Sequence, residues 1–207
     1  MSPRPRQASD EDILKAAFRA ISRVGPARLT LTDVAEEAGV SAAALMQRFG
    51  SKRALLLAAA ADAARGSDYI FPDLRARHRS PLAALLGMAE CMTLMGSTPA
   101  GVANTLAFLQ IDLTDPDFHR YALAASQGTR AGIRALVKDA IKAGELVRCD
   151  ADRLASALQA TMNGSLLGWA VHGEGHLVAW IRRDLRMVLD PYRARAKRRV
   201  GRTREGL

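Results

Sequence analysis

Apolar residues recur every three or four positions along most of the chain, which is the spacing of a helix with one buried face. The first run extends from Ile13 to Ile21, follows the capping residue Ser9 and stops before Gly25-Pro26. Later runs keep this period, and no stretch of the sequence alternates convincingly like a β-strand. We therefore expect an all-α protein of about nine helices.

Capping residues mark where most of these helices begin. Five polar residues that can accept hydrogen bonds from a helix N-terminus stand before an apolar run: Ser9, Thr30, Ser41, Ser51 and Asp150. Three more precede a proline, which suits the first helical turn: Ser80-Pro81, Thr98-Pro99 and Asp115-Pro116. Gly173 and Pro191 are expected to stop the last two long helices.

The most informative segment is TLTDVAEEAGVSAAALMQRFGSK, residues 30–52. It predicts two short helices joined by a tight turn at residues 39–41. Gly39 suits this turn because a left-handed backbone costs glycine little, and Ser41 can cap the second helix. Two short helices in this arrangement form a helix-turn-helix, here at about residues 30–49, whose second helix enters the DNA major groove. An ordinary helical hairpin is the alternative interpretation of the pattern taken alone.

The surroundings of this segment resemble the tetracycline-repressor (TetR) family of transcriptional regulators. The resemblance rests on ILKAAFRAISRVG at 13–25, Thr30, DVAEEAGVS at 33–41 and LMQRFGSKRALL at 45–56. It implies an N-terminal three-helix DNA-binding domain, joined to a larger helical domain for ligand binding and dimerisation. We expect a flexible basic arm at 1–9, the DNA-binding domain at 10–66, the larger domain at 67–192 and a disordered Arg-rich tail at 193–207.

The second helix of the motif departs from the resemblance at two positions. The family commonly has Tyr at the position of Met46, and His or Tyr at that of Arg48. Residues 42–44 are alanines, which can only touch thymine methyls or allow close backbone approach. Gln47 is then the expected adenine reader, unless it is simply a solvated surface residue, and Arg48 a guanine or phosphate contact. The full set of expected DNA contacts is Thr30, Thr32, Ser41, Ala42, Ala43, Met46, Gln47, Arg48 and Lys52, the last as a phosphate ligand.

A small-molecule effector pocket in the larger domain is also implied by the resemblance. The sequence supplies an adaptable sulfur-rich stripe and several polar or aromatic residues: Met88, Cys91, Met92, Met95, Asn104, Phe108, Asp112, His119, Gln127 and Asn163. Ordinary core packing is the more usual explanation of such a sulfur-rich stripe. We expect an apolar or amphipathic ligand that releases a repressor from its operator, although no residue excludes activation.

Dimerisation is expected because one reading helix makes few base contacts, and two half-sites of a palindromic operator give more. The family pairs its last two helices with those of a second copy. The apolar positions of residues 151–172 and 176–189 exceed what one buried stripe needs. The residues expected at this homodimer interface are Leu158, Met162, Leu166, Trp169, Ile181 and Leu185.

The net charge of +9 is concentrated at the two ends of the chain. Residues 1–65 carry ten Lys/Arg against seven Asp/Glu, the middle is balanced, and residues 193–207 carry seven against one. Basic ends favour a polyanionic partner for the ends alone. They keep open a nonspecific DNA binder, and the alanines of 42–44 keep open a helical ligand- or protein-binding module. Arg4 and Arg6 suit either a minor-groove arm or a solubilising tail.

Other functional classes are disfavoured by the sequence. It contains no nucleophile elbow, P-loop or dinucleotide fingerprint, so neither an enzyme nor a cofactor is expected. His172 and His176 have a metal-ligand spacing, but Gly173 and Gly175 indicate a loop there and we expect no metal. The two cysteines are expected to be reduced thiols. No apolar stretch is long enough for a bilayer, and no signal peptide is visible, so we expect a soluble cytoplasmic protein that does not engage a membrane.

Overall fold

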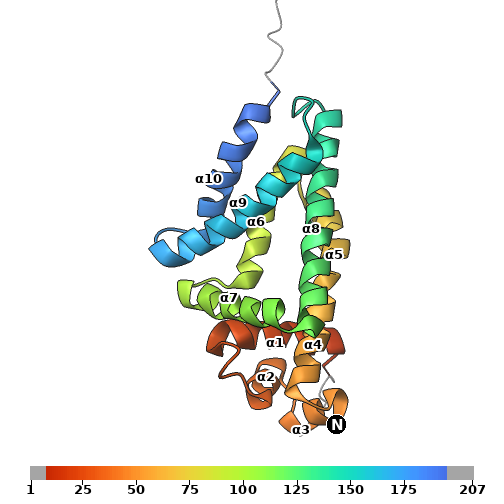
Figure 1. Cartoon of the computed structure of the whole chain (residues 1–207), viewed down its shortest axis with the longest axis vertical. Helices are drawn as coiled ribbons and strands as arrows, with labels where there is room; N and C mark the ends of the chain where they lie inside the picture. The colour runs from red at the N-terminus through yellow and green to blue at the C-terminus, as the bar shows by residue number, and fades with distance from the viewer. Residues whose placement is uncertain (1–7, 195–207) are drawn as a thin grey trace, which may run out of the picture.

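The computed structural model describes residues 8–194, which form ten α-helices and two short 3₁₀ helices (Figure 1). The N-terminal four are α1 (Asp10–Val24), α2 (Leu31–Ala38), α3 (Ala42–Phe49) and α4 (Lys52–Ala64). The remainder are α5 (Ser67–Arg77), α6 (Pro81–Cys91), α7 (Pro99–Thr114), α8 (Pro116–Lys142), α9 (Ala151–His172) and α10 (Leu177–Leu189). The 3₁₀ helices are η1 (Met92–Met95) and η2 (Asp190–Tyr192). The expected all-α fold is confirmed.

The predicted helix starts are confirmed by their hydrogen bonds. All eight predicted capping side chains accept a backbone N–H of the first turn of the helix that follows. Ser9 and Thr30 form complete capping boxes with Asp12 and Asp33, respectively. Gly173 ends α9 in a left-handed conformation. These side chains replace the backbone partners that the first turn of a helix lacks, so the helix boundaries follow from local chemistry.

Helix α5 is the element that the sequence pattern did not predict. It contains Pro72 in its interior, where a proline removes a backbone donor, and it begins without a side-chain cap. Burial compensates for these defects, since Phe71 and Leu74 are inserted into the core. Tertiary packing therefore overrides a weak local helix signal.

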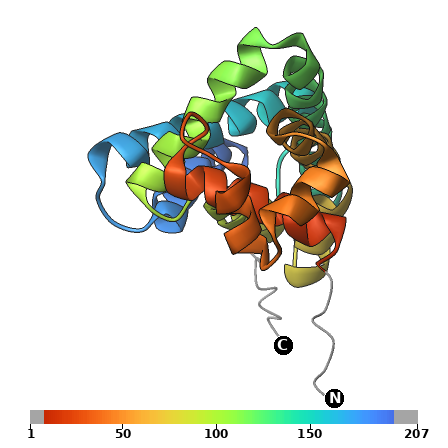
Figure 2. The same ribbon diagram turned by 90° about the horizontal axis from the view of Figure 1, so that it is seen from below.

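The buried residues form two separate hydrophobic clusters. The head core consists of the buried residues of α1–α4 and Leu29, together with Phe108 of α7 and Phe118 of α8. The body core consists of the buried residues of α5, α6, α8, α9 and α10, with Val102 and Leu146. Helices α7 and α8 contribute to both, so they join the two cores. Seen from below, the N-terminal helices lie in front of the remaining helices (Figure 2).

Helices α7, α8 and α9 make pairwise contacts and form a triangle (Figure 1). Asp115 alone connects α7 to α8, so these two helices meet in a sharp corner. The opposite end of α8 is joined to the end of the described chain. There Val147 N–H donates to the Tyr192 carbonyl at 2.8 Å, and Ala194 N–H donates to that of Glu145 at 3.0 Å. The α7–α8 corner lies at the head end of the body, beside α1 and α4 (Figure 1), and Phe118 next to it belongs to the head core.

No helix in residues 8–194 is long and apolar enough to cross a membrane. The free thiols of Cys91 and Cys149 are half-buried, and burial raises the pKa of both. Both cysteines are thus unpaired, as expected. Most of the predicted basic arm (1–7 of 1–9) and of the predicted Arg-rich tail (195–207 of 193–207) lies outside the described residues.

Gly132 provides a test of the packing of α5 on α8. A Cβ atom at this position would overlap the ring of Phe71. Gly132→Ala should therefore destabilise the protein by about 1–3 kcal/mol through overpacking, although alanine favours helices. In a Phe71→Leu background the same change should cost less, because the shorter side chain leaves room. Denaturant unfolding measures both, and a Gly132→Ala protein more stable than the parent would contradict this packing.

Candidate functional site

Helices α2 and α3 form the predicted helix-turn-helix. Gly39 ends α2 in the left-handed region (φ 68°, ψ 34°), and Val40 N–H donates to the Ala35 carbonyl at 3.0 Å. Ser41 then caps α3 by accepting the N–H of Ala44 at 3.1 Å. Leu45 is fully buried in the head core and fixes which side of α3 faces inward. The turn therefore holds α3 at the surface with one face committed to packing.

The outward face of α3 carries few hydrogen-bonding groups. Successive helical residues are rotated by about 100°, which places Gln47 opposite the side that buries Leu45 and Phe49. Gln47 and Ala43 are exposed, and Met46 is 50% exposed beside them. Within residues 8–194 no hydrogen bond holds the Gln47 amide. Gln47 is thus the available polar group at the centre of this face.

Arg48 is turned away from that outward face. Its guanidinium donates to the Ala8 carbonyl at 2.8 Å and pairs with the Asp10 carboxylate at the start of α1. A hollow of about 420 Å³ lies beside this contact, between α3 and α1. The structure thus gives Arg48 a role that the sequence did not suggest, because it ties the reading helix to α1. These contacts use only part of the guanidinium, whose other N–H donors are left for a further contact.

Lys52 is also engaged inside the protein. Its ammonium donates to the carbonyls of Leu29, at 2.5 Å, and Pro26, at 3.3 Å. It therefore joins the beginning of α4 to the loop between α1 and α2. The phosphate contact expected for Lys52 stays a prediction. The contacts that the structure shows hold α4 to the preceding loop.

The two hydroxyl residues Thr30 and Ser41 serve as helix caps, whereas Thr32 is exposed on α2. The Thr30 hydroxyl donates to Asp33 at 2.6 Å, and this hydrogen bond is the main reason that the pKa of Asp33 is lowered. The Asp33 carboxylate is therefore ionised and held by the cap. These contacts fix the N-terminus of α2, which is the first helix of the motif.

One guanidinium joins the head to the α7–α8 corner. Arg53, the second residue of α4, donates to Asp115 at 2.7 and 3.0 Å and to Asp117 at 3.0 Å. It also lies over the ring of Phe118, with Cζ 5.4 Å from the ring centroid, and Phe118 packs edge-on against Phe108. We call this group the Arg53 junction. It connects helices α1–α4, which we call the reading head, to the larger domain. The sequence pattern did not indicate this contact.

The predicted effector-pocket residues do not gather around one cavity. Met88 is buried in the body core, and Cys91, Met92 and Met95 pack against that core. Phe108 belongs to the head core, and the Asn104 amide donates to the carbonyls of Ser22 and Arg23 at the end of α1. These two residues therefore attach α7 to the head rather than offering a ligand surface. Three of the others are exposed: His119, Gln127 and Asn163.

Asp112 differs from the other predicted pocket residues. It is half-buried on α7, and burial raises the pKa of its carboxyl group to about 6, while the charge of His119 acts in the opposite direction. Three leucines on the two helices of the corner are exposed: Leu109, Leu113 and Leu123. The sequence analysis missed the leucines because their exposure depends on how α7 and α8 meet.

The six residues predicted at the dimer interface are wrong as interface residues. All are at most 6% exposed and lie inside the body core of a single chain, so a partner could not touch them: Leu158, Met162, Leu166, Trp169, Ile181 and Leu185. The helical pattern correctly identified the buried stripe of α9 and α10. It could not distinguish packing within the chain from packing between chains.

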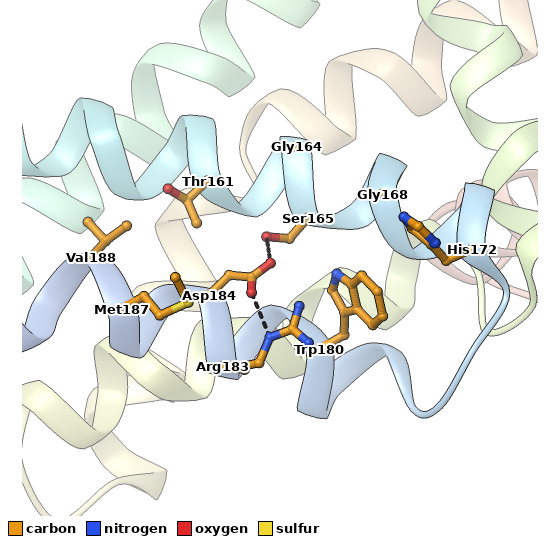
Figure 3. Close-up of a pocket in the computed structure, with 10 residues that line it drawn as sticks. All are labelled: Thr161, Gly164, Ser165, Gly168, His172, Trp180, Arg183, Asp184, Met187 and Val188. Atoms are coloured by element: carbon orange, nitrogen blue, oxygen red, sulfur yellow. Dashed lines mark hydrogen bonds and ion pairs between the residues drawn. The ribbon is translucent and has the colours of Figure 1, made fainter.

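The outer face of α9 and α10 carries a different set of residues (Figure 3). A groove of about 440 Å³ runs between the two helices, with Gly164 and Gly168 on one side and Trp180 and Met187 on the other. Ser165 forms part of its lining and donates to Asp184 at 2.7 Å. Large apolar residues are exposed on these two helices: Leu167 (53%), Val171 (75%) and Met187 (68%).

The loop with the metal-like spacing shows no metal-site geometry. Among the residues that the structure describes, no group of three or more His, Cys, Asp or Glu side chains could hold a metal ion. His172 packs against the Trp180 ring with centroids 5.5 Å apart, and Trp169 Nε1–H donates to the Gly175 carbonyl at 3.2 Å. The loop therefore closes the α9–α10 hairpin.

Comparison with known families and structures gives consistent matches. Residues 13–59 match the profile of the bacterial regulatory proteins of the tetR family, and residues 72–190 match the C-terminal profile of BetI-type transcriptional repressors. A search of curated proteins finds no matching sequence. The two profile matches together include the helix-turn-helix, the α7–α8 corner and both helices of the outer face.

Solved structures share the fold across almost the whole chain. E. coli NemR in its reduced form has a TM-score of 0.70 at 14% identity, covering 90% of this chain and 99% of that one. A putative regulator from Saccharomonospora viridis, in complex with choline, has 0.69 at 22%, covering 90% and 98%. FadR from Bacillus subtilis, in complex with stearoyl-CoA, has 0.63 at 16%, covering 87% and 98%.

The observed contacts of Lys52 lead to a prediction that needs no DNA. Lys52→Met keeps the apolar stem but leaves the two carbonyls without their donor, which should lower stability by about 1–3 kcal/mol. Thermal unfolding of the free protein measures the effect. Lys15→Met is the matched control: Lys15 pairs with Glu11 on the exposed side of α1, and its loss should change stability little. Equal stability of the Lys52→Met variant and the parent would contradict the structural role.

Proposed function

The chain belongs to the TetR family of transcriptional regulators, and on that premise we propose that it is a homodimeric repressor that binds a palindromic operator. A small apolar or amphipathic ligand would release it from the DNA. Its site of action would be chromosomal DNA in the cytoplasm, and we propose no enzymatic activity or cofactor for it.

The observation that carries the DNA-binding proposal is that one side of α3 packs into the head while the opposite side is exposed. Leu45 and Phe49 pack into the head, Ser41 caps the helix, and the side opposite them presents Gln47 without an internal partner. A glutamine amide can donate to and accept from the edge of adenine in the major groove. Since the neighbouring residues 43 and 44 are alanines, the proposed interface depends on Gln47, close backbone approach and DNA shape.

The outer face of α9 and α10 is the proposed dimer interface. Its exposed apolar side chains would be covered by the same face of a second copy, as expected for a two-fold contact. Gly164 and Gly168 support close approach there, since a Cβ at either position would have no atom within 4 Å apart from its chain neighbours and the nearby backbone of α9. Such a dimer would present its two α3 helices to half-sites about 34–36 Å apart, or a multiple of that spacing.

The proposed release by a ligand is a population shift. A ligand that binds better to an arrangement of the heads unsuited to the operator lowers DNA affinity, with a typical coupling of about 1–3 kcal/mol. The structurally similar proteins from S. viridis and B. subtilis were solved with choline and with stearoyl-CoA, respectively. For this chain, the Arg53 junction is the proposed route between the larger domain and the head.

A nonspecific DNA binder that uses the basic ends is the second candidate, favoured by the charge of residues 193–207. Competition between operator and bulk DNA separates the two. A specific regulator should prefer its operator by roughly 10³-fold or more. The nonspecific binder should show no such preference, and removal of residues 193–207 should nearly abolish its binding.

Selection of bound fragments from genomic DNA is the direct test of sequence-specific binding. The wild-type protein should select a palindromic consensus. Gln47→Ala should relax the preference at one position of each half-site, by about 1–3 kcal/mol in discrimination, because the base loses its only side-chain reader there. Gln110→Ala changes an exposed glutamine on α7 and should leave the consensus unaltered. An unchanged consensus for Gln47→Ala would overturn the role given to Gln47.

Sedimentation at micromolar concentration tests the dimer. The parent should be a dimer, and Val171→Glu should shift it towards monomer because a carboxylate would be buried in the proposed contact. Val147→Glu is the control, since Val147 is exposed in the loop between α8 and α9, off the proposed interface. A monomeric parent, or a Val171→Glu variant that dimerises as tightly as the parent, would contradict the interface.

A further inference from the structure

The α7–α8 corner combines an incompletely buried apolar surface with a carboxyl group that forms no hydrogen bond or ion pair within residues 8–194. On α7, Val102 and Leu106 contact the body core, and Leu109 and Leu113 continue the same stripe at helical spacing. These last two residues are 46% and 63% exposed. The stripe therefore extends beyond the core that covers its first half.

Helix α8 shows the same discontinuity. Ile133 and Val137 lie in the body core, and helical spacing continues their side of α8 back towards His119. His119 is exposed, and Leu123, one turn further along α8, is 49% exposed. Because α7 and α8 meet at Asp115, the uncovered parts of both stripes lie near the corner.

Asp112 lies at the edge of this surface. Helix geometry sets it one turn from Leu109 and about 60° around α7 from it, whereas Leu113, the next residue, points about 100° away. No group in the described part of the chain donates a hydrogen bond to its carboxylate or forms an ion pair with it, although the residue is half-buried. Burial raises the pKa of Asp112 to about 6 and the charge of His119 acts in the opposite direction, so above pH 7 the structure keeps a partly desolvated anion there that no described residue pairs with directly.

We propose that the α7–α8 corner is the effector site and that it selects amphipathic cations, with Asp112 facing the cationic group and Leu109, Leu113 and Leu123 covering the apolar part. This inference rests on the proposed function and names the ligand class for it. A neutral ligand would leave the Asp112 carboxylate without compensation, and an anionic ligand would be repelled by it. A cation with an apolar chain satisfies both features of the surface.

The same corner connects the site to the reading head. Asp115 lies one helical turn beyond Asp112 and accepts two of the hydrogen bonds of Arg53. Phe118, on the other arm of the corner, packs in the head core and under the Arg53 guanidinium. A ligand that fills the corner therefore acts on the segment that holds the start of α4.

Isothermal titration with three probes of equal chain length tests the selectivity: decyltrimethylammonium, decanol and decyl sulfate, each below its micellar concentration at pH 8. The full-length protein should bind the ammonium probe at least about tenfold more tightly than the sulfate, a difference of ~1.4 kcal/mol. Asp112→Asn should lose about tenfold in affinity for the ammonium probe and keep its affinity for decanol. Asp112→Glu, which retains the charge, should keep most of the preference.

Two controls keep the result interpretable. Asp68→Asn removes an exposed carboxylate at the start of α5 and should leave all three affinities unchanged. Leu123→Ala should weaken binding of all three probes, because it removes apolar surface and no charge. The proposal is overturned if Asp112→Asn binds the ammonium probe like the parent, or if the parent prefers the sulfate.

Operator binding without ligand is measured on the same proteins, so that the two proposals fail separately. A chain that selects palindromic DNA but shows no cation preference keeps the proposed function and loses this effector site. A chain that prefers the cation through Asp112 but selects no operator keeps the binding site and loses the proposed function. Circular dichroism confirms that each variant is folded before its affinity is compared.

Discussion

The Arg53 junction is the polar contact between the head and the corner of the larger domain. A guanidinium at the start of α4 bonds two aspartates at the point where α7 turns into α8. An exposed ion pair alone contributes little, but here it lies over Phe118, and Phe118 and Phe108 are buried in the head core. The corner thus belongs to the head core through Phe118, and it is one of the places, with Asn104 at the end of α1, where the larger domain holds the head.

The helices of the reading head are held in place by internal contacts, and the outward side of α3 carries few hydrogen-bonding groups. Caps at Thr30, Ser41 and Ser51 satisfy the helix N-termini, and Lys52 and Arg48 tie α4 and α3 to α1 or its following loop. Two of the three charged or amide side chains expected to meet DNA are therefore engaged within the protein. Gln47 is left as the available amide, which makes backbone approach and DNA shape important to the proposed recognition.

The two outward surfaces of the larger domain differ in chemistry. The α9–α10 face combines exposed apolar side chains with two glycines and a hydrogen-bonded Ser165–Asp184 pair, which suits a close contact between like helices. The α7–α8 corner combines leucines with the Asp112 carboxylate, which forms no hydrogen bond or ion pair with the described residues, and this suits a small charged molecule. This contrast is why we assign the first to a second copy of the chain and the second to an effector.

All the α-helices in residues 8–194 except α5, and the helix-turn-helix, could be predicted from the sequence, because they depend on contacts between residues close along the chain. Each cap acts within three residues, the Gly39 turn joins adjacent helices, and an amphipathic period reveals a buried side. The family resemblance, which the profile matches confirm, follows from the same local residues.

Which partner each of these side chains contacts depends on the tertiary structure. Leu158 and Ile181 are buried within the chain. Lys52 and Arg48 form their polar contacts with other parts of the head. Asn104 and Phe108 contact the head and do not line a pocket. Helix α5 forms in spite of Pro72 because burial of Phe71 and Leu74 in the body core stabilises it. Such contacts join residues many positions apart, so the period of the sequence shows that a side is buried but not what covers it.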